Sequence, residues 1–269
     1  MICGNVESIV LSKIYSKPSG EVDYKIPENK YYREIRQCRH CSIVFNKHDN
    51  LLKSNFYSGF YNTSINKNLI YERFLKIISF NYNDSDNKQR TLRIIKFLYQ
   101  NDYCLSELLL LDIGSGTGVF NFELNKFGVI PFNIDPDQTV IDHIKRNTKT
   151  RNAFCGYLND YKSNLKFDLI TLNKVLEHFD NPLNSLKQVI KLLKNNGIIY
   201  LELPNATPTL TIKNFQDRAE FNIEHVTIYT AKSLSKLINE TGGEILDIQQ
   251  ISDPSGKNTI YCFAQFCKK

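Results

Sequence analysis

The sequence predicts an α/β fold in which a doubly wound, mostly parallel sheet is covered by helices. Four consecutive leucines at 108–111 show no polar alternation, which is typical of a strand buried on both faces. Similar short apolar runs then alternate with stretches whose apolar residues recur at helical spacing, the pattern of successive strand–helix units. Two apolar segments at 244–251 and 259–266, joined by a Ser-Asp-Pro-Ser-Gly turn, predict a closing pair of strands, the last of them antiparallel.

The remaining elements follow from apolar periodicity and from the residues that start or stop a helix. Thr230 suits the N-cap of the last helix, and Asn196-Gly197 is a stop signal before the fifth strand. The sheet should therefore contain seven strands. They are expected at 108–111, 129–134, 153–155, 167–172, 198–203, 244–251 and 259–266, with helices at 69–80, 91–99, 119–126, 138–146, 183–193 and 231–239.

The length of 269 residues favours one large domain with an appendage. We expect a small cysteine-containing module at 1–55, a helical lead segment at 56–103 and the α/β domain at 104–269. Residues 206–230, with threonine-rich turns and mixed polarity, are expected to insert beside the substrate.

Composition narrows the class of function. Thirty-four Lys and Arg against 28 Asp and Glu give a net charge of +6, which suits anionic small molecules, and the basic residues are too scattered to require nucleic acid. No apolar run approaches the length of a membrane span and no signal segment opens the chain, so we expect a cytoplasmic protein without a membrane partner. Seven cysteines indicate thiols or a metal site in place of a disulfide framework. The oligomeric state is not predicted.

A triple-glycine turn follows the leucine strand. Glycines at 114, 116 and 118 let the backbone approach a ligand closely, but their spacing departs from the dinucleotide pattern Gly-x-Gly-x-x-Gly. Asp112 precedes the first glycine, where a carboxylate would repel a pyrophosphate and attract an ammonium or sulfonium group. The loop therefore favours a cationic nucleoside.

Asp112-x-Gly-x-Gly-x-Gly118 resembles motif I of the class I, Rossmann-like S-adenosylmethionine-dependent methyltransferases. In that family an acid at the end of the second strand binds the ribose hydroxyls, and Asp135 lies 17 residues after Gly118. The alternative for Asp135 is an ordinary acid at a helix N-terminus. The resemblance implies cofactor contacts from Asp112, Gly114, Ser115, Gly116, Gly118, Asp135, Pro136, Leu158 and Asn173, with Asn159 or Asp160 as further candidates near the adenine.

The first module carries Cys3 and the pair Cys38-x-x-Cys41, which has zinc-knuckle spacing. It resembles the zinc module that precedes many bacterial methyltransferases of sugar, capsule and antibiotic pathways, but one of the four thiolates is missing. The natural start could lie upstream, His40 or His48 could substitute, or the module could survive without metal as a β-rich packing element. Zinc and reduced cysteines are both compatible with the sequence.

Residues expected on the acceptor side come from three segments. The stretch after the fourth strand, Asn173 to Pro182, resembles the corresponding family segment and brings Glu177 and His178, which are either catalytic or scaffolding. Glu224-His225 lies where sugar-modifying members carry a base, so His225 is the candidate for substrate deprotonation, with a loop-capping histidine as the alternative. Tyr57 and Tyr61 are candidates near the reactive methyl by position, or else packing residues.

The combined prediction is an S-adenosylmethionine-dependent methyltransferase acting on a small, anionic metabolite such as a nucleotide-linked sugar or a phosphorylated precursor of a polysaccharide or natural product. Two alternatives remain open. An RNA methyltransferase would need a basic stripe with stacking aromatics. A cofactor-binding subunit without catalysis would keep the glycines and Asp135 but lack turnover.

Overall fold

The computed structural model describes residues 2–4, 7–48 and 67–267. The described residues form two compact units. The first unit gathers segments from within Met1–Lys53, Lys174–Lys187 and Leu201–Gln265; the second unit gathers segments from within Ser54–Asn173 and Gln188–Tyr200, together with the end of the chain. The sequence predicts consecutive parts, whereas these units combine segments that are distant along the chain.

The first unit contains a four-stranded antiparallel sheet built largely from the N-terminal module. Its strands are β1 (Ser8–Ile14), β2 (Arg33–Cys38), β3 (Val44–Lys47) and β9 (Thr227–Ile228), in the order β1-β2-β3-β9. The short β9 joins the insertion predicted at 206–230 to this sheet. Apolar side chains from both segments form one buried cluster, which includes Ile35, Val44, Phe221, Ile223 and Ile228.

A seven-stranded sheet confirms the predicted fold class. Its order is β10-β11-β8-β7-β4-β5-β6, with β4 parallel to both β5 and β7 and with β10 antiparallel to β11. All four residues of β4 are buried, which explains why the leucine run shows no polar alternation. The strands are β4 (Leu110–Ile113), β5 (Phe132–Asp135), β6 (Asn152–Cys155), β7 (Phe167–Asn173), β8 (Leu193–Pro204), β10 (Glu244–Ser252) and β11 (Asn258–Phe266).

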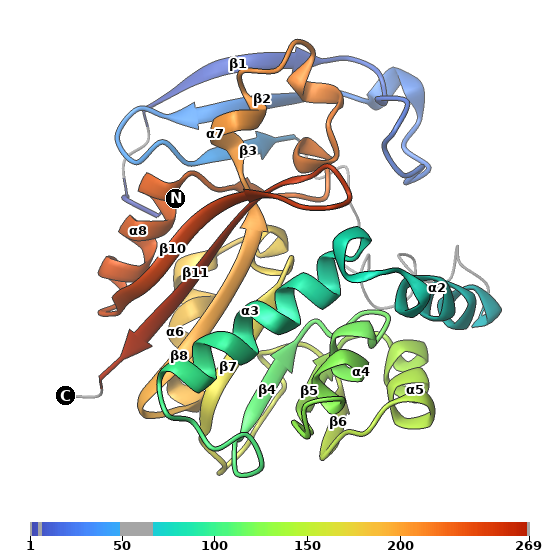
Figure 1. Ribbon diagram of the computed structural model, residues 1–269. Coiled ribbons are helices and arrows are strands. Elements are labelled where there is room, and N and C mark those ends of the chain that lie inside the picture. Colours follow the sequence, from blue (N-terminus) through green and yellow to red (C-terminus); the bar gives the residue numbers. More distant parts are fainter. Residues whose placement is uncertain (1, 5–6, 49–66, 268–269) are drawn as a thin grey trace. The chain divides into compact units, whose positions relative to one another are not determined.

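Helices of the second unit pack against these strands and against each other (Figure 1). Helix α5 lies on β5 and β6, while α3 packs on α4 and α2 contacts both α4 and α5. The α-helices of the chain are α2 (Lys67–Ser79), α3 (Asp86–Gln100), α4 (Val119–Asn125), α5 (Gln138–Asn147), α6 (Pro182–Leu192), α7 (Ala206–Thr209) and α8 (Ala231–Glu240). Short 3₁₀ turns are η1 (Glu28–Lys30), η3 (Tyr82–Asp84), η4 (Leu176–His178), η5 (Phe215–Asp217) and η6 (Ala219–Phe221). No described helix is long and apolar enough to cross a bilayer.

Some helices and strands begin earlier than predicted, because polar residues at their starts interrupt the apolar pattern. Helix α3 begins at Asp86, five residues before the expected start, because Ser85 caps it by accepting a hydrogen bond from the Lys88 amide at 3.3 Å. Strand β8 begins at Leu193, before the expected start at 198, and Asn196 lies within it with a positive φ of 59°. The predicted N-cap of α8 is confirmed, since Thr230 and Ser233 form a reciprocal capping box.

Candidate functional site

The glycine turn connects β4 to α4 in the second unit. Gly118 is the N-cap of α4 with φ 73°, and a Cβ there would lie 3.1 Å from Ile144 Cγ1. Gly116 also has a positive φ, of 50°, but a Cβ there would meet nothing within 4 Å. Gly118 is therefore required by the turn and by packing, whereas Gly116 borders open space that a ligand can use.

Asp112 lies at the end of β4 with only 2% of its surface exposed. One carboxylate oxygen, Oδ1, accepts hydrogen bonds from Thr171 Oγ1 at 2.6 Å and from Asn173 Nδ2 at 3.0 Å. Burial raises the pKa of Asp112 to about 6, and hydrogen bonds and the charge of Arg90 oppose that rise. Asp112 is therefore a fixed and mostly ionised carboxylate at neutral pH.

A cavity of about 140 Å³ borders this carboxylate. It brings together five of the predicted cofactor residues with two side chains of α3, Asn87 and Arg90, which the sequence interpretation missed. Arg90 Nη1 donates to Asn87 Oδ1 at 3.0 Å. The signal available in the sequence was their spacing of three, which places both on one helix face. The lining residues are Asn87, Arg90, Asp112, Gly114, Ser115, Gly116, Thr117, Val119, Phe120 and Asn173.

Asp135 ends β5 and lies against the glycine turn. Its Oδ2 accepts from the Gly116 amide and its Oδ1 from the Asp137 amide, both at 3.0 Å. Burial raises the pKa of Asp135 to about 7, and the charges of Asp137 and Asp112 add to the rise. Pro136 follows directly and Leu158 lies in the turn after β6; Gly118, Asp135, Pro136 and Leu158 do not line the cavity, although Asp135 bonds to Gly116, which does.

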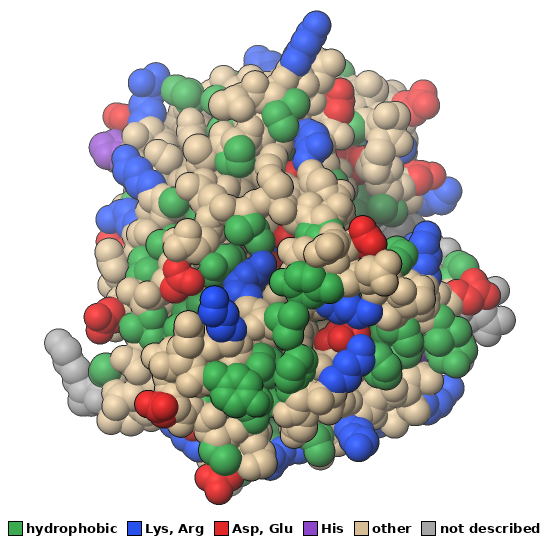
Figure 2. All heavy atoms as spheres, viewed as in Figure 1, with side chains coloured by type: hydrophobic (Ala, Val, Ile, Leu, Met, Phe, Trp, Pro, Cys, Tyr) green, Lys and Arg blue, Asp and Glu red, His purple; other side chains and the backbone are tan. Residues whose placement is uncertain are grey.

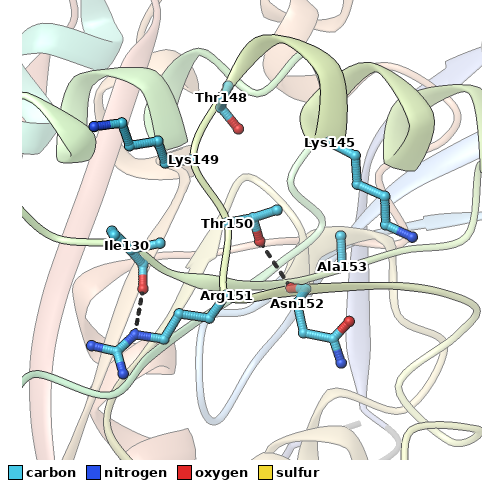
Figure 3. A pocket seen from close by; sticks show the side chains of 8 residues that line it. All are labelled: Ile130, Lys145, Thr148, Lys149, Thr150, Arg151, Asn152 and Ala153. Carbon is cyan, nitrogen blue, oxygen red and sulfur yellow. Dashed lines mark hydrogen bonds between the residues drawn. The ribbon is translucent and has the colours of Figure 1, made fainter.

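A larger pocket of about 500 Å³ opens at the start of β6 (Figure 3). Arg151 Nε donates to the Ile130 carbonyl at 3.1 Å, and Lys145 and Lys149 extend their side chains at its rim. It contains none of the predicted site residues. Ligands of open α/β sheets bind beyond the carboxyl ends of the strands, so we assign the cofactor to the smaller cavity.

In the first unit, the structure brings His178 of η4 together with Glu224 and His225 of the insertion. The two imidazole centroids lie 5.0 Å apart. His178 Nδ1 is 3.0 Å from the Glu224 carbonyl and His225 Nδ1 is 2.9 Å from the Glu220 carbonyl. A carbonyl oxygen only accepts, so both Nδ1 atoms donate, and in the neutral rings the lone pair is on Nε2.

The electrostatics of this cluster favour a neutral His225 ring. Burial, followed by the charge of His178, lowers the pKa of His225 well below its ordinary value. Glu177 is fully buried beside the pair, and burial raises its pKa while His178 and Lys174 oppose the rise. The four residues His178, Glu224, His225 and Glu177, predicted from two distant segments, thus form one cluster.

A buried arginine network supports the loop that carries His225, and the sequence interpretation missed it. Arg33 of β2 is completely buried; its Nη2 donates to Glu21 Oε2 at 3.0 Å and its Nη1 to Asn46 Oδ1 at 2.7 Å. Asn46 Nδ2 in turn donates to the His225 carbonyl at 2.8 Å. Glu21 Oε2 accepts from the Ile223 amide at 2.7 Å. The N-terminal sheet therefore fixes the backbone on both sides of Glu224.

The three predicted metal-binding cysteines are also gathered. The Sγ atoms of Cys3, Cys38 and Cys41 lie within 4.8 Å of one another, and no further Cys, His, Asp or Glu in the described part of the chain joins the group. Burial would raise the pKa of Cys38, but backbone amides of Cys41 and His40 outweigh it and hold the pKa below its ordinary value. Burial raises the pKa of Cys41 to about 12. Of these two thiols, Cys38 is therefore the one that ionises more readily.

Tyr57 and Tyr61, predicted near the reactive methyl, lie outside the described residues.

Comparison with known proteins identifies the family of the chain. The family "Methyltransferase domain" matches residues 84–248. Ubiquinone biosynthesis O-methyltransferase of Histophilus somni is 26% identical over 123 residues, covering 42% of this chain and 52% of the relative, and that of Pelagibacter ubique is 30% identical over 111 residues, covering 40% and 46%. The matches thus span about half the length of these curated relatives.

A solved structure shows the same fold. Magnesium protoporphyrin IX methyltransferase (ChlM) from Synechocystis, with bound SAH, aligns with a TM-score of 0.58 at 15% identity over 79% of this chain and 96% of its own. The chain belongs to the methyltransferase domain family. This membership confirms the predicted class of enzyme and its Rossmann-like fold.

Proposed function

We propose that this methyltransferase uses S-adenosylmethionine to methylate a small, anionic metabolite such as a nucleotide-linked sugar or phosphorylated precursor. The observation that carries the proposal is the cavity at the carboxyl end of β4, where a fixed carboxylate, an open glycine turn and a buried arginine meet. This charge pattern matches the amino-acid end of the donor, which carries both an ammonium and a carboxylate.

Each part of the donor has a candidate partner. Asp112, held by Thr171 and Asn173, suits the ammonium, and the Arg90 guanidinium suits the carboxylate. Asp135 is assigned to the ribose hydroxyls, because each of its oxygens accepts one backbone amide and keeps a further lone pair. We assign Pro136 and Leu158 to the adenine side.

S-adenosylmethionine supplies a methyl group on a sulfonium, which is already an excellent leaving group, so the chain mainly has to align the reactants and exclude water. An oxygen acceptor must also lose a proton. We assign that proton to His225 Nε2, because Nδ1 is committed to the Glu220 carbonyl. His178 and Glu224 hold the loop around the base through the 3.0 Å bond between them.

The donor assignment is tested with Asp135→Ala. Removing the carboxylate should weaken S-adenosylmethionine binding by about 10- to 100-fold, the cost of losing charge-assisted hydrogen bonds of roughly 1.5–3 kcal/mol. Isothermal titration calorimetry measures it, with Asp142→Ala on the exposed face of α5 as the matched control. Unchanged affinity in Asp135→Ala would remove the ribose contact from the proposal.

The acceptor class is tested by turnover. We expect adenosylhomocysteine release with pools of nucleotide sugars or phosphorylated metabolites and none with RNA, and the release should fall at least 100-fold in His225→Ala with donor affinity preserved. The scattered lysines and arginines in Figure 2 give no basic stripe on the face shown. Turnover with RNA alone would select the RNA methyltransferase, and binding without turnover on any pool would select the non-catalytic subunit.

We further propose that Cys3, Cys38 and Cys41 supply three ligands of a structural zinc. Their clustered sulfurs and the ready ionisation of Cys38 support this. A closed zinc site has four ligands, so the fourth would come from outside this group.

A further inference from the structure

We propose that Glu177, His178 and His225 form a binding site for a divalent transition-metal cation. One carboxylate oxygen and one nitrogen of each imidazole all lie within 4.8 Å of one another. Ligands on opposite sides of a zinc-type ion, at bonds of about 2.1 Å, are at most roughly 4.2 Å apart, so closing the site needs only a small contraction. Two histidines and one carboxylate are a ligand set that such ions prefer.

Glu177 gives the strongest sign that the cluster takes an occupant. The side chain is 0% exposed, and neither carboxylate oxygen has a hydrogen-bond partner among the described residues. An ionised carboxylate that is buried and unpaired costs several kcal/mol, a penalty that folded proteins avoid by protonation, by pairing or by metal coordination. A cation between Glu177 and the two rings would neutralise the carboxylate and satisfy the oxygen that lies near the imidazole nitrogens.

Other charges near Glu177 do not replace such a cation. Lys174 Nζ lies 3.7 Å from Asp253 Oδ2 and also bonds to the Thr259 hydroxyl, which directs its ammonium to a different carboxylate. Lys257 acts on His225 from a distance, and Glu202 adds negative charge near Glu177. The Tyr229 hydroxyl is buried nearby but neutral, since burial and the charge of Glu177 both raise the pKa of Tyr229.

Both imidazoles carry a hydrogen bond of the kind that supports metal-ligating histidines. Each donates its Nδ1 proton to a backbone carbonyl, of Glu224 for His178 and of Glu220 for His225, which is the outer hydrogen bond that fixes metal-ligating histidines. The lone pair is thereby on Nε2. The Asn46 amide and the buried Arg33 hold the loop of His225 in place, so one ligand is already positioned before a cation arrives.

A cation at this site would affect the proposed methyl transfer, and this effect rests on the proposed function of His225 as the base. His225 Nε2 has one lone pair, which either takes the acceptor's proton or binds the cation. A bound cation should therefore slow methyl transfer, and the cluster would make turnover sensitive to free zinc.

Cobalt(II) is the probe that separates this site from the cysteines. In the full chain stripped with a chelator, Co²⁺ bound by nitrogen and oxygen gives visible absorption without the intense near-ultraviolet band of thiolate ligands. We expect this visible signal to persist in Cys38→Ser, to vanish in Glu177→Gln and to be unchanged in Glu240→Gln, whose carboxylate is on the exposed face of α8. A signal that is purely of the thiolate type, or one retained in Glu177→Gln, would overturn the proposal.

Two further measurements guard against a folding defect. His178→Ala removes one ligand and should weaken Co²⁺ binding at least 10- to 100-fold while circular dichroism stays native; unchanged affinity in this folded variant would also overturn the site. Zinc should reduce turnover of the wild type in step with its occupancy. If the wild type binds the cation without any change in turnover, the metal site stands and the base role of His225 is wrong. If it binds no cation but turnover still depends on His225, the metal site is wrong and the base role stands.

Discussion

The two units organise polar side chains in opposite ways. In the second unit, the proposed donor residues follow neighbouring strands, and most of them lie between Asp112 and Asp135. In the first unit, the cluster joins residues 46 positions apart, His178 and Glu224, and a buried arginine from β2 supports it. The proposed donor site is therefore a local motif on a parallel sheet, whereas the proposed acceptor site exists only once distant segments have packed.

The largest effect should come from breaking the long-range support. Arg33→Met leaves the buried Glu21 without its cationic partner, which should lower the free energy of unfolding by about 3–5 kcal/mol, measured by urea titration. Adding Glu21→Gln to Arg33→Met should restore part of the lost free energy of unfolding, because the buried carboxylate charge is then removed as well. A loss below about 1 kcal/mol in Arg33→Met would show that the network does not hold the first unit together.

The turn of the second unit should respond more mildly. Gly118→Ala has to accommodate a positive φ and a contact of 3.1 Å with Ile144, so we expect a loss of about 1–3 kcal/mol. Gly116→Ala should lose only about 1 kcal/mol, from the positive φ of the backbone. Its methyl group enters the open space, however, so it should weaken donor binding more than Gly118→Ala does. Equal donor affinities in the two variants would contradict the assignment of that space.

The same contrast explains what the sequence could predict. The seven strands, the antiparallel ending and the glycine turn follow from local patterns, since burial on both faces and a positive φ leave marks in consecutive residues. Arg90 was missed because a buried arginine looks like any polar residue of an amphipathic helix. Arg33 was missed for a related reason: its partners Glu21 and Asn46 lie 12 and 13 residues away, and no spacing rule links them.

The last prediction is the pH dependence of donor binding, and it separates the two units again because it depends mainly on Asp135 of the second unit. Ribose hydroxyls are best accepted by an ionised carboxylate, and the pKa of Asp135 is about 7 in the free protein. Donor affinity should therefore rise by about tenfold between pH 6 and pH 8, because only about a tenth of Asp135 is ionised at pH 6. Calorimetry at the two pH values measures it, and Asp135→Asn should show a flatter profile.

The free energy of unfolding should fall as pH rises, whereas donor affinity rises. A carboxyl whose pKa is raised in the folded chain contributes stability while it is protonated, and loses that contribution as pH rises from about 4 through 6 for Asp112 and through 7 for Asp135. The free protein should then unfold more easily at pH 8 than at pH 6, while saturating donor should narrow that difference, because the donor binds the ionised form. A donor affinity and a free energy of unfolding that both stay constant between pH 6 and pH 8 would show that Asp135 is ionised throughout this range and that its burial does not control binding.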